Sequence, residues 1–125
     1  MPSPPRRVLV IDDEPSIAAT LQELLTGLGH TVQLAETASA GLRLVRDFRP
    51  DVVLLDLGLP DMPGELVLER LHAVDPQLPV IMVTGNTDQD LARRTLAHGA
   101  FDYIAKPFHG ARVDQVLEAA LTYRS

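Results

Sequence analysis

Five apolar segments recur at fairly regular intervals along the chain. They lie at residues 8–11, 31–35, 52–55, 80–83 and 103–105. The first, third and fourth are continuous and rich in β-branched residues, which is typical of parallel strands buried on both faces. The second alternates apolar and polar residues, and the fifth is short. The pattern therefore predicts five strands, of which the second and fifth lie at the edges of a sheet.

Apolar residues at helical spacing follow each of these segments. The five sets are Ile17, Leu21, Leu24, Leu25 and Leu28; Leu42, Val45 and Phe48; Val67, Leu71 and Val74; Leu91, Leu96 and Ala97; and Val113, Val116, Leu117, Ala120 and Leu121. Such spacing places each set on one face of a helix. Thr37 or Ser39 is predicted to cap the second helix. The fourth helix is predicted to begin at Thr87 and Asp88 and to end at Gly99.

The alternation of strands and helices determines the expected fold. Strand–helix–strand units with right-handed crossovers form a parallel sheet that helices cover on both faces, and five units are too few for an eight-stranded barrel. The expected class is α/β: a three-layer, doubly wound (βα)5 sandwich of the flavodoxin-like type, whose five-stranded parallel sheet has the order 2-1-3-4-5. We expect one domain over 7–123 after a short disordered lead, 1–6.

Composition narrows the classes of function. The chain contains no cysteine, which excludes disulfides, thiolate-bound metals and thiol catalysis. Its formal net charge is −6 and only 4% of its residues are aromatic, so direct nucleic-acid binding by this chain is not expected. The sequence shows neither an apolar stretch long enough to span a membrane nor a secretory leader. We therefore expect a cytoplasmic protein without membrane contact.

Polar residues with complementary chemistry follow four of the predicted strands. Asp12 and Asp13 follow the first strand, Asp56 the third, Thr84 the fourth and Lys106 the fifth. In a doubly wound sheet, ligands bind outside the carboxyl ends of the strands, at the point where the strand order reverses. For the expected order, this point lies between the first and third strands. Lys106 is the only lysine of the chain, which indicates a position that needs a compact ammonium group.

Three aspartates that meet at one sheet edge repel one another unless a cation neutralises them. Oxygen ligands that leave room for water favour Mg²⁺, with Mn²⁺ as an alternative. A single aspartate at a strand end is often only a solvated or helix-capping residue. Four strand ends with complementary groups do not fit that explanation as a set, so the sequence predicts a divalent-cation site.

Four motifs carry a resemblance to a known family. They are VLVIDDEP at 8–15, DVVLLDLGLPDMPG at 51–64, VIMVTG at 80–85 and GAFDYIAKPF at 99–108. Together they resemble the response-regulator receiver domain of two-component signalling, and the resemblance spans nearly the whole of 7–123. It implies a phosphorylation-dependent switch rather than a metabolic enzyme. Such a domain assists only its own phosphorylation and slow dephosphorylation.

The resemblance also implies roles for the residues at the strand ends. Asp56 would be the phosphoacceptor, receiving its phosphoryl group from a sensor histidine kinase or a phosphotransfer protein. Asp13 and Asp56 would be side-chain ligands of Mg²⁺, and Asp12 would act through a water molecule. Gly58 would offer its backbone carbonyl to the ion. The metal set is therefore Asp12, Asp13, Asp56 and Gly58.

Further roles concern the phosphorylated state. Thr84 would hydrogen-bond a phosphoryl oxygen, Lys106 would pair with the phosphoryl charge, and Tyr103 would be the aromatic switch residue. The bond between Lys106 and Pro107 would be a cis peptide. Phosphorylation would change the surface of the fourth helix, fifth strand and fifth helix. That surface would control an output domain or a partner, or form a homodimer.

The sequence fits three alternative functions less well. A haloacid-dehalogenase-type phosphatase needs a second aspartate two residues after its nucleophile, and Gly58 stands there. A flavin-binding electron carrier on the same fold needs a phosphate loop after the first strand, where Asp12, Asp13 and Glu14 would repel phosphate. A degenerate receiver that acts only as a scaffold is disfavoured because the residue set is complete. The receiver interpretation is therefore preferred.

The sequence does not determine every property of such a domain. Gly58 replaces the larger side chain frequent in the family, and Asn86 stands two residues after Thr84. In the family, both positions flank the path of the attacking water and influence how long the acyl phosphate survives. The sequence therefore does not show whether that lifetime is short or long in this protein. The sequence does not name the kinase, the stimulus or the output domain. It also does not decide between a stand-alone regulator and part of a longer protein.

Overall fold

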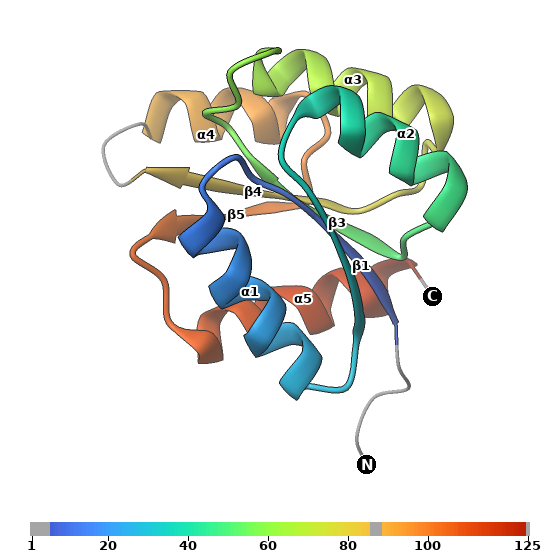
Figure 1. The fold of residues 1–125 in the computed structure, drawn as a ribbon. Coiled ribbons are helices and arrows are strands. Elements are labelled where there is room, and N and C mark those ends of the chain that lie inside the picture. The colour runs from blue at the N-terminus through green and yellow to red at the C-terminus, as the bar shows by residue number, and fades with distance from the viewer. Residues whose placement is uncertain (1–5, 86–88, 125) are drawn as a thin grey trace.

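The computed structural model describes residues 6–85 and 89–124, within which five strands alternate with five helices (Figure 1). Their bounds are β1 Arg7–Ile11, α1 Pro15–Gly27, β2 Thr31–Ala35, α2 Ala38–Phe48, β3 Val52–Asp56, α3 Gly64–Val74, β4 Val80–Gly85, α4 Gln89–Ala97, β5 Asp102–Lys106 and α5 Gly110–Arg124. The predicted alternation of elements is therefore confirmed.

All strand pairs in the sheet are parallel, and the strand order is β2-β1-β3-β4-β5. Figure 1 shows α1 and α5 on one face of the sheet and α2, α3 and α4 on the other. The expected three-layer, doubly wound α/β fold is confirmed, with β2 and β5 at the edges. Strand order reverses between β1 and β3, so the carboxyl ends of these two strands flank the place where a ligand would bind.

Two cores lie on the two faces of the sheet because successive side chains of a strand point to opposite faces. In β1, Leu9 and Ile11 pack with α2 and α3, whereas Val8 and Val10 pack with α1 and α5. All five residues of β3 are buried. This double burial explains why the central strands are continuously apolar, since neither face meets water.

The ends of the helices follow the local chemistry of the chain. Thr37 caps α2, because its side chain accepts a hydrogen bond from the Ala40 N–H at 3.1 Å. Gly99 follows α4 with a φ of +104°, a backbone conformation that glycine adopts without strain. The predicted start of α4 at Thr87 and Asp88 lies outside the described residues.

The expected disordered lead is described only at its last residue. The Arg6 carbonyl accepts a hydrogen bond from the Thr31 N–H at 2.9 Å, and the Arg6 N–H donates to His30 Nδ1 at 3.3 Å. Arg6 thus extends the pairing of β1 with β2 by one residue, while 1–5 lie outside the described residues. Among the helices that the structure describes, none has both the length and the apolar character to cross a membrane.

Gly41 allows α2 to pack closely on β1. A β-carbon at this position would lie 2.8 Å from Ile11 Cγ1 and would also collide with Ile11 Cδ1. Ile11 is fully buried, so it has little room to move aside. We expect Gly41→Ala to lower the free energy of unfolding by about 1–3 kcal/mol, as overpacking does, in a chemical denaturation experiment.

The matched control is Gly27→Ala at the end of α1, where a β-carbon meets nothing within 4 Å. There the better helix propensity of alanine should leave stability unchanged or raise it by up to about 1 kcal/mol. Equal effects of the two substitutions would contradict the close approach of α2 to β1.

Candidate functional site

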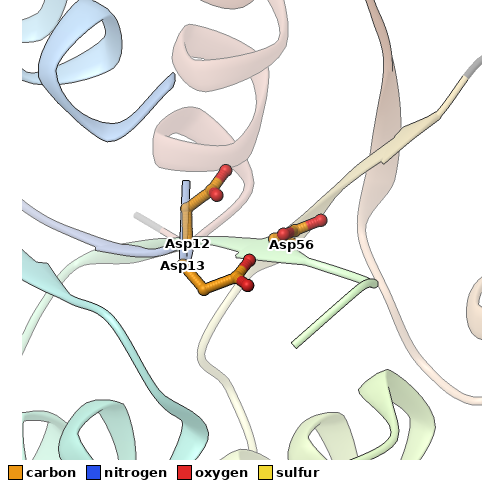
Figure 2. Close-up of side chains that lie close together, drawn as sticks. All are labelled: Asp12, Asp13 and Asp56. Atoms are coloured by element: carbon orange, nitrogen blue, oxygen red, sulfur yellow. The ribbon is translucent and has the colours of Figure 1, made fainter. Parts of the chain in front are cut away.

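Three carboxylates meet at the carboxyl ends of β1 and β3. Parallel pairing sets Ile11 beside Leu55, so the residues that follow, Asp12 and Asp56, are neighbours across the two strands. Asp12, Asp13 and Asp56 each offer one carboxylate oxygen, and these oxygens lie within 4.8 Å of one another (Figure 2). Asp12 and Asp56 are buried and Asp13 is half-buried. These three side chains, which follow β1 and end β3, therefore lie together, as expected from their positions at the strand ends.

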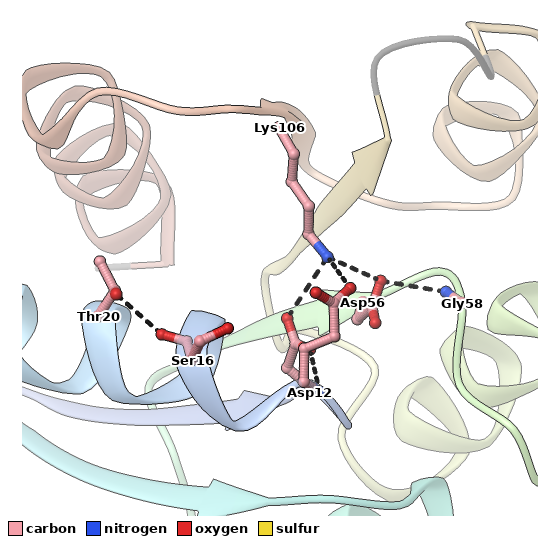
Figure 3. A network of polar contacts seen from close by, with 7 residues as sticks. Asp12, Ser16, Thr20, Asp56, Gly58 and Lys106 are labelled. Atoms are coloured by element: carbon pink, nitrogen blue, oxygen red, sulfur yellow. Dashed lines mark hydrogen bonds and ion pairs between the residues drawn. The ribbon is translucent and has the colours of Figure 1, made fainter.

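Lys106 reaches this cluster from the end of β5. Its Nζ lies 3.6 Å from Asp56 Oδ1 and 3.8 Å from Asp12 Oδ2 (Figure 3). It also donates a hydrogen bond to Glu14 Oε1 at 3.2 Å. The Lys106 side chain is 18% exposed, and that of Glu14 is 56% exposed. One ammonium group therefore faces two buried carboxylates, and its third partner, the Glu14 carboxylate, is exposed to solvent.

The surroundings of Asp12 and Asp56 disfavour charge on these two carboxylates. Burial raises the pKa of Asp12 to about 6, and the charge of Asp56 raises it further. The hydrogen bond from the Glu14 N–H and the attraction of Lys106 lower this pKa, but they do not cancel the effect of burial. Burial also raises the pKa of Asp56, and Asp13 adds to this shift. For Lys106, burial alone would lower the pKa, but attraction to the surrounding carboxylates outweighs it and raises the pKa.

Asp12 carries one oxygen whose hydrogen-bonding capacity is unused. Asp12 Oδ1 accepts from the Glu14 N–H at 2.9 Å, whereas Oδ2 is buried and has no hydrogen-bond partner among the described residues. A buried carboxylate oxygen without a donor is costly, and this one lies beside two further carboxylates. An all-oxygen set with this deficit of positive charge fits a hard divalent cation such as Mg²⁺ or Mn²⁺.

The residues around the carboxylates leave an open hollow of about 460 Å³, which Asp13, Glu14, Asp56, Gly58, Thr84 and Lys106 help to line. The Gly58 N–H donates to Asp56 Oδ1 at 3.1 Å. Thr84 is buried, and its hydroxyl donates to the Gly85 carbonyl at 3.2 Å. A group bound to Asp56 would therefore lie near a hydroxyl, an ammonium and a backbone N–H.

The remaining features singled out in the sequence are Tyr103, the peptide bond after Lys106, and Asn86. Tyr103 on β5 is half-buried and packs against the core on the α2–α3 face; it is not among the residues that line the hollow. The Lys106–Pro107 peptide bond is cis. Asn86, which was expected to flank the path of water, lies outside the described residues.

Asp61 is a structural residue that the sequence patterns did not single out. It lies in the loop between β3 and α3, and its carboxylate accepts from the N–H groups of Ala38 and Ser39 at 2.9 and 3.1 Å. These hydrogen bonds, that of Ala38 foremost, hold the pKa of Asp61 below its usual range. The loop that follows Asp56 is thereby fixed to the start of α2. Only three-dimensional proximity reveals this, because the partners lie more than 20 residues apart in sequence.

Comparison with known proteins identifies relatives over nearly the whole chain. The family described as the response regulator receiver domain matches residues 8–118. The DNA-binding response regulator MtrA of Mycolicibacterium smegmatis is 44% identical over 103 residues, which cover 82% of this chain and 45% of that protein. The transcriptional regulatory protein KdpE of Mycobacterium tuberculosis is 46% identical over 101 residues, covering 81% of this chain and 44% of that protein.

Solved structures show the same architecture. A response regulator receiver domain protein from Clostridium thermocellum superimposes with a TM-score of 0.89 at 31% identity, covering 94% of each chain. The receiver domain of NtrX from Brucella abortus also gives a TM-score of 0.89, at 33% identity, covering 92% of this chain and 98% of that one. The chain spans between about a quarter and a half of the length of the first curated relatives that it matches.

Proposed function

Because this chain belongs to the response regulator receiver domain family, we propose that it is a phosphorylation switch whose phosphoacceptor is Asp56. Receiver domains are signalling modules of two-component systems, and the proposed domain spans 7–123. The observation that carries the proposal is the meeting of Asp12, Asp13, Asp56 and Lys106 where the strand order reverses. The phosphoryl donor would be a sensor histidine kinase or a phosphotransfer protein.

Asp56 would act as a nucleophile toward phosphorus. A carboxylate oxygen of Asp56 forms the new P–O bond while the bond from phosphorus to the donor's histidine nitrogen breaks, which leaves an acyl phosphate on Asp56. Asp12, Asp13, Asp56 and the Gly58 carbonyl would hold Mg²⁺ or Mn²⁺. When bound, such an ion neutralises charge on the carboxylates and on the phosphoryl oxygens.

Lys106 and Thr84 would stabilise the phosphoryl group. The Lys106 ammonium already faces Asp56 at 3.6 Å and would exchange its bond to Glu14, at 3.2 Å, for a phosphoryl oxygen. The Thr84 hydroxyl now donates to the Gly85 carbonyl and would turn toward another oxygen of the phosphoryl group. Positive charge and donors placed where charge accumulates stabilise both the transition state and the product.

The signal would leave through α4, β5 and α5. Movement of Thr84 would free space behind β4, and Tyr103 would then turn inward and change this surface. The surface carries exposed ion pairs, among them Arg93 with Asp90 and Arg112 with Asp102, each at 3.8 Å. Such mixed charge suits a reversible partner. That partner would be an output domain, a separate protein or a second copy of the chain.

The proposal is tested by incubating the protein with Mg²⁺ and acetyl phosphate. We expect incorporation of one phosphoryl group that withstands acid and is released by hydroxylamine, as an acyl phosphate is. Intact-protein mass spectrometry measures the incorporation. An unlabelled protein, or a label that hydroxylamine does not release, would contradict the proposal.

A related prediction concerns the metal. Mg²⁺ that binds only the folded protein stabilises it by about 2.7 kcal/mol at one hundred times the dissociation constant. We expect Asp13→Ala to weaken Mg²⁺ binding by about tenfold or more, because one charged ligand is lost. Protons compete for the same oxygens, so binding to the wild type should weaken as the pH falls through the Asp12 pKa of about 6.

Thermal melts across a Mg²⁺ titration measure both effects. Asp90→Asn, which alters a side chain that is 89% exposed on α4, serves as the control and should bind Mg²⁺ like the wild type. Equal Mg²⁺ stabilisation of Asp13→Ala and the wild type would exclude Asp13 as a ligand.

A further inference from the structure

Arginines are distributed unevenly over the molecule. Those on α4 and α5 at 93, 94 and 112 each have a carboxylate partner. A second group gathers at α2, α3 and the amino-terminal edge of the sheet, and none of its members forms an ion pair within 6–85 and 89–124. This group is Arg7, Arg43, Arg46, Arg49 and Arg70.

Three of these arginines, Arg43, Arg46 and Arg70, border a groove between α2 and α3, two helices that lie side by side on one face of the sheet (Figure 1). The groove measures about 660 Å³, and Leu42, Ala73 and Val74 supply its apolar lining between Arg43, Arg46 and Arg70. An adjoining hollow of about 480 Å³ shares Arg46 and Val74 and adds Arg7 and Arg49. We call the two together the arginine groove.

The charge of the arginine groove opposes that of the whole protein. Five arginines face only three aspartates there, Asp47, Asp51 and Asp75, although the chain carries a net charge of −6. One of these aspartates, Asp51, accepts a hydrogen bond from the Arg7 backbone N–H at 2.8 Å, and the Arg7 Nε donates to the Arg49 carbonyl at 3.0 Å. Arg43, Arg46 and Arg70 are exposed, and they line the same groove as the apolar strip formed by Leu42, Ala73 and Val74.

We propose that the arginine groove is the docking site for an acidic, amphipathic helical segment of a partner protein. The apolar side of that segment would cover Leu42, Ala73 and Val74, including a valine that is 37% exposed. Its carboxylates would pair with the arginines, whose planar guanidinium groups bind carboxylates in bidentate fashion. A helix lying in an apolar groove is a recurring mode of peptide recognition. The site is separate from Asp56 and does not depend on the proposed phosphorylation.

A protein segment fits this surface better than a nucleic acid does. A sugar–phosphate backbone has no apolar side that could cover the apolar strip, and the net charge of −6 repels a long polyanion. Aromatic residues on which bases stack are absent among the residues that line the two described hollows. An acidic helix uses both the apolar strip and the arginines.

The test uses the full chain and a synthetic peptide of about 12 residues, about 18 Å as a helix, which matches α2 with its 11 residues. Leucines form one side of the peptide and glutamates the flanks, and a matched peptide carries glutamine in place of glutamate. We expect amide signals of α2 and α3 to shift on titration with the acidic peptide. The dissociation constant should rise about tenfold or more for the glutamine peptide, and binding should weaken as salt increases.

Variants of the protein assign the site. Replacing Arg43, Arg46 and Arg70 by alanine should weaken binding about tenfold or more, whereas Arg112→Ala on α5 should leave it unchanged. Replacing the same three arginines by glutamate should reverse the preference toward a peptide with lysine flanks, which separates a docking role from loss of folding. Four results would overturn the proposal: absence of binding, equal affinity for the glutamine peptide, tighter binding of a DNA duplex at the groove, or self-association through it.

Discussion

Asp56→Asn is expected to lower the rate of phosphoryl incorporation from acetyl phosphate on the order of a hundredfold or more, while the fold is retained. An amide lacks the anionic oxygen that attacks phosphorus, so the variant loses the nucleophile. Its side-chain carbonyl still offers an acceptor to the Gly58 N–H, which now donates to Asp56 at 3.1 Å. The initial rate of labelling in the presence of Mg²⁺ measures the effect.

Two controls make this result specific. Asp90→Asn changes an exposed aspartate outside the cluster and should be labelled like the wild type. A circular dichroism spectrum and a denaturation curve for Asp56→Asn should show a folded protein, so that loss of labelling is not loss of structure. Wild-type labelling of Asp56→Asn would place the phosphoryl group on another residue.

The sequence was sufficient for the fold because its evidence is local. Continuous apolar strands such as β3 and helical spacings such as that of α2 depend on neighbours within a few residues. Strand order followed from the edge character of β2 and β5. The aspartates and Lys106 meet because parallel strands bring their carboxyl ends to one edge of the sheet, and this argument needs no knowledge of side-chain contacts.

Contacts between distant segments were beyond the sequence patterns. Glu14 and Lys106 are 92 residues apart in the chain and form a hydrogen bond. Their spacing in the sequence does not predict this contact. Asp61 was unremarkable in a proline-containing loop, yet it holds the start of α2. The arginine groove could not be predicted from the sequence patterns either, because it depends on two helices packing side by side. Periodicity places residues on a face, but the neighbour of that face is decided by tertiary packing.

Asp12→Asn is expected to stabilise the metal-free protein at pH 7. In the wild type, burial raises the pKa of Asp12 to about 6, so at pH 7 its charge is held against an unfavourable environment. Asparagine has no charge, and its carbonyl oxygen keeps the hydrogen bond that Asp12 Oδ1 accepts from the Glu14 N–H at 2.9 Å. Lys106 retains Asp56 and Glu14 as partners. The free energy of unfolding in EDTA should rise on the order of 1–3 kcal/mol.

The sign of the pH dependence follows from the same shift. Between pH 6 and the ordinary aspartate pKa of 3.8, Asp12 is mostly protonated in the folded wild type and mostly ionised in the unfolded chain. Lowering the pH through this range therefore removes the penalty of the charge and stabilises the wild type relative to the variant. The advantage of Asp12→Asn should shrink from pH 7 downward and vanish near pH 3.8. Asp61→Asn is the opposite case: the pKa of Asp61 is held low by the N–H of Ala38, so that variant should be less stable than wild type at pH 7. A destabilised Asp12→Asn, or an advantage that does not change with pH, would contradict an unfavourable charge at Asp12.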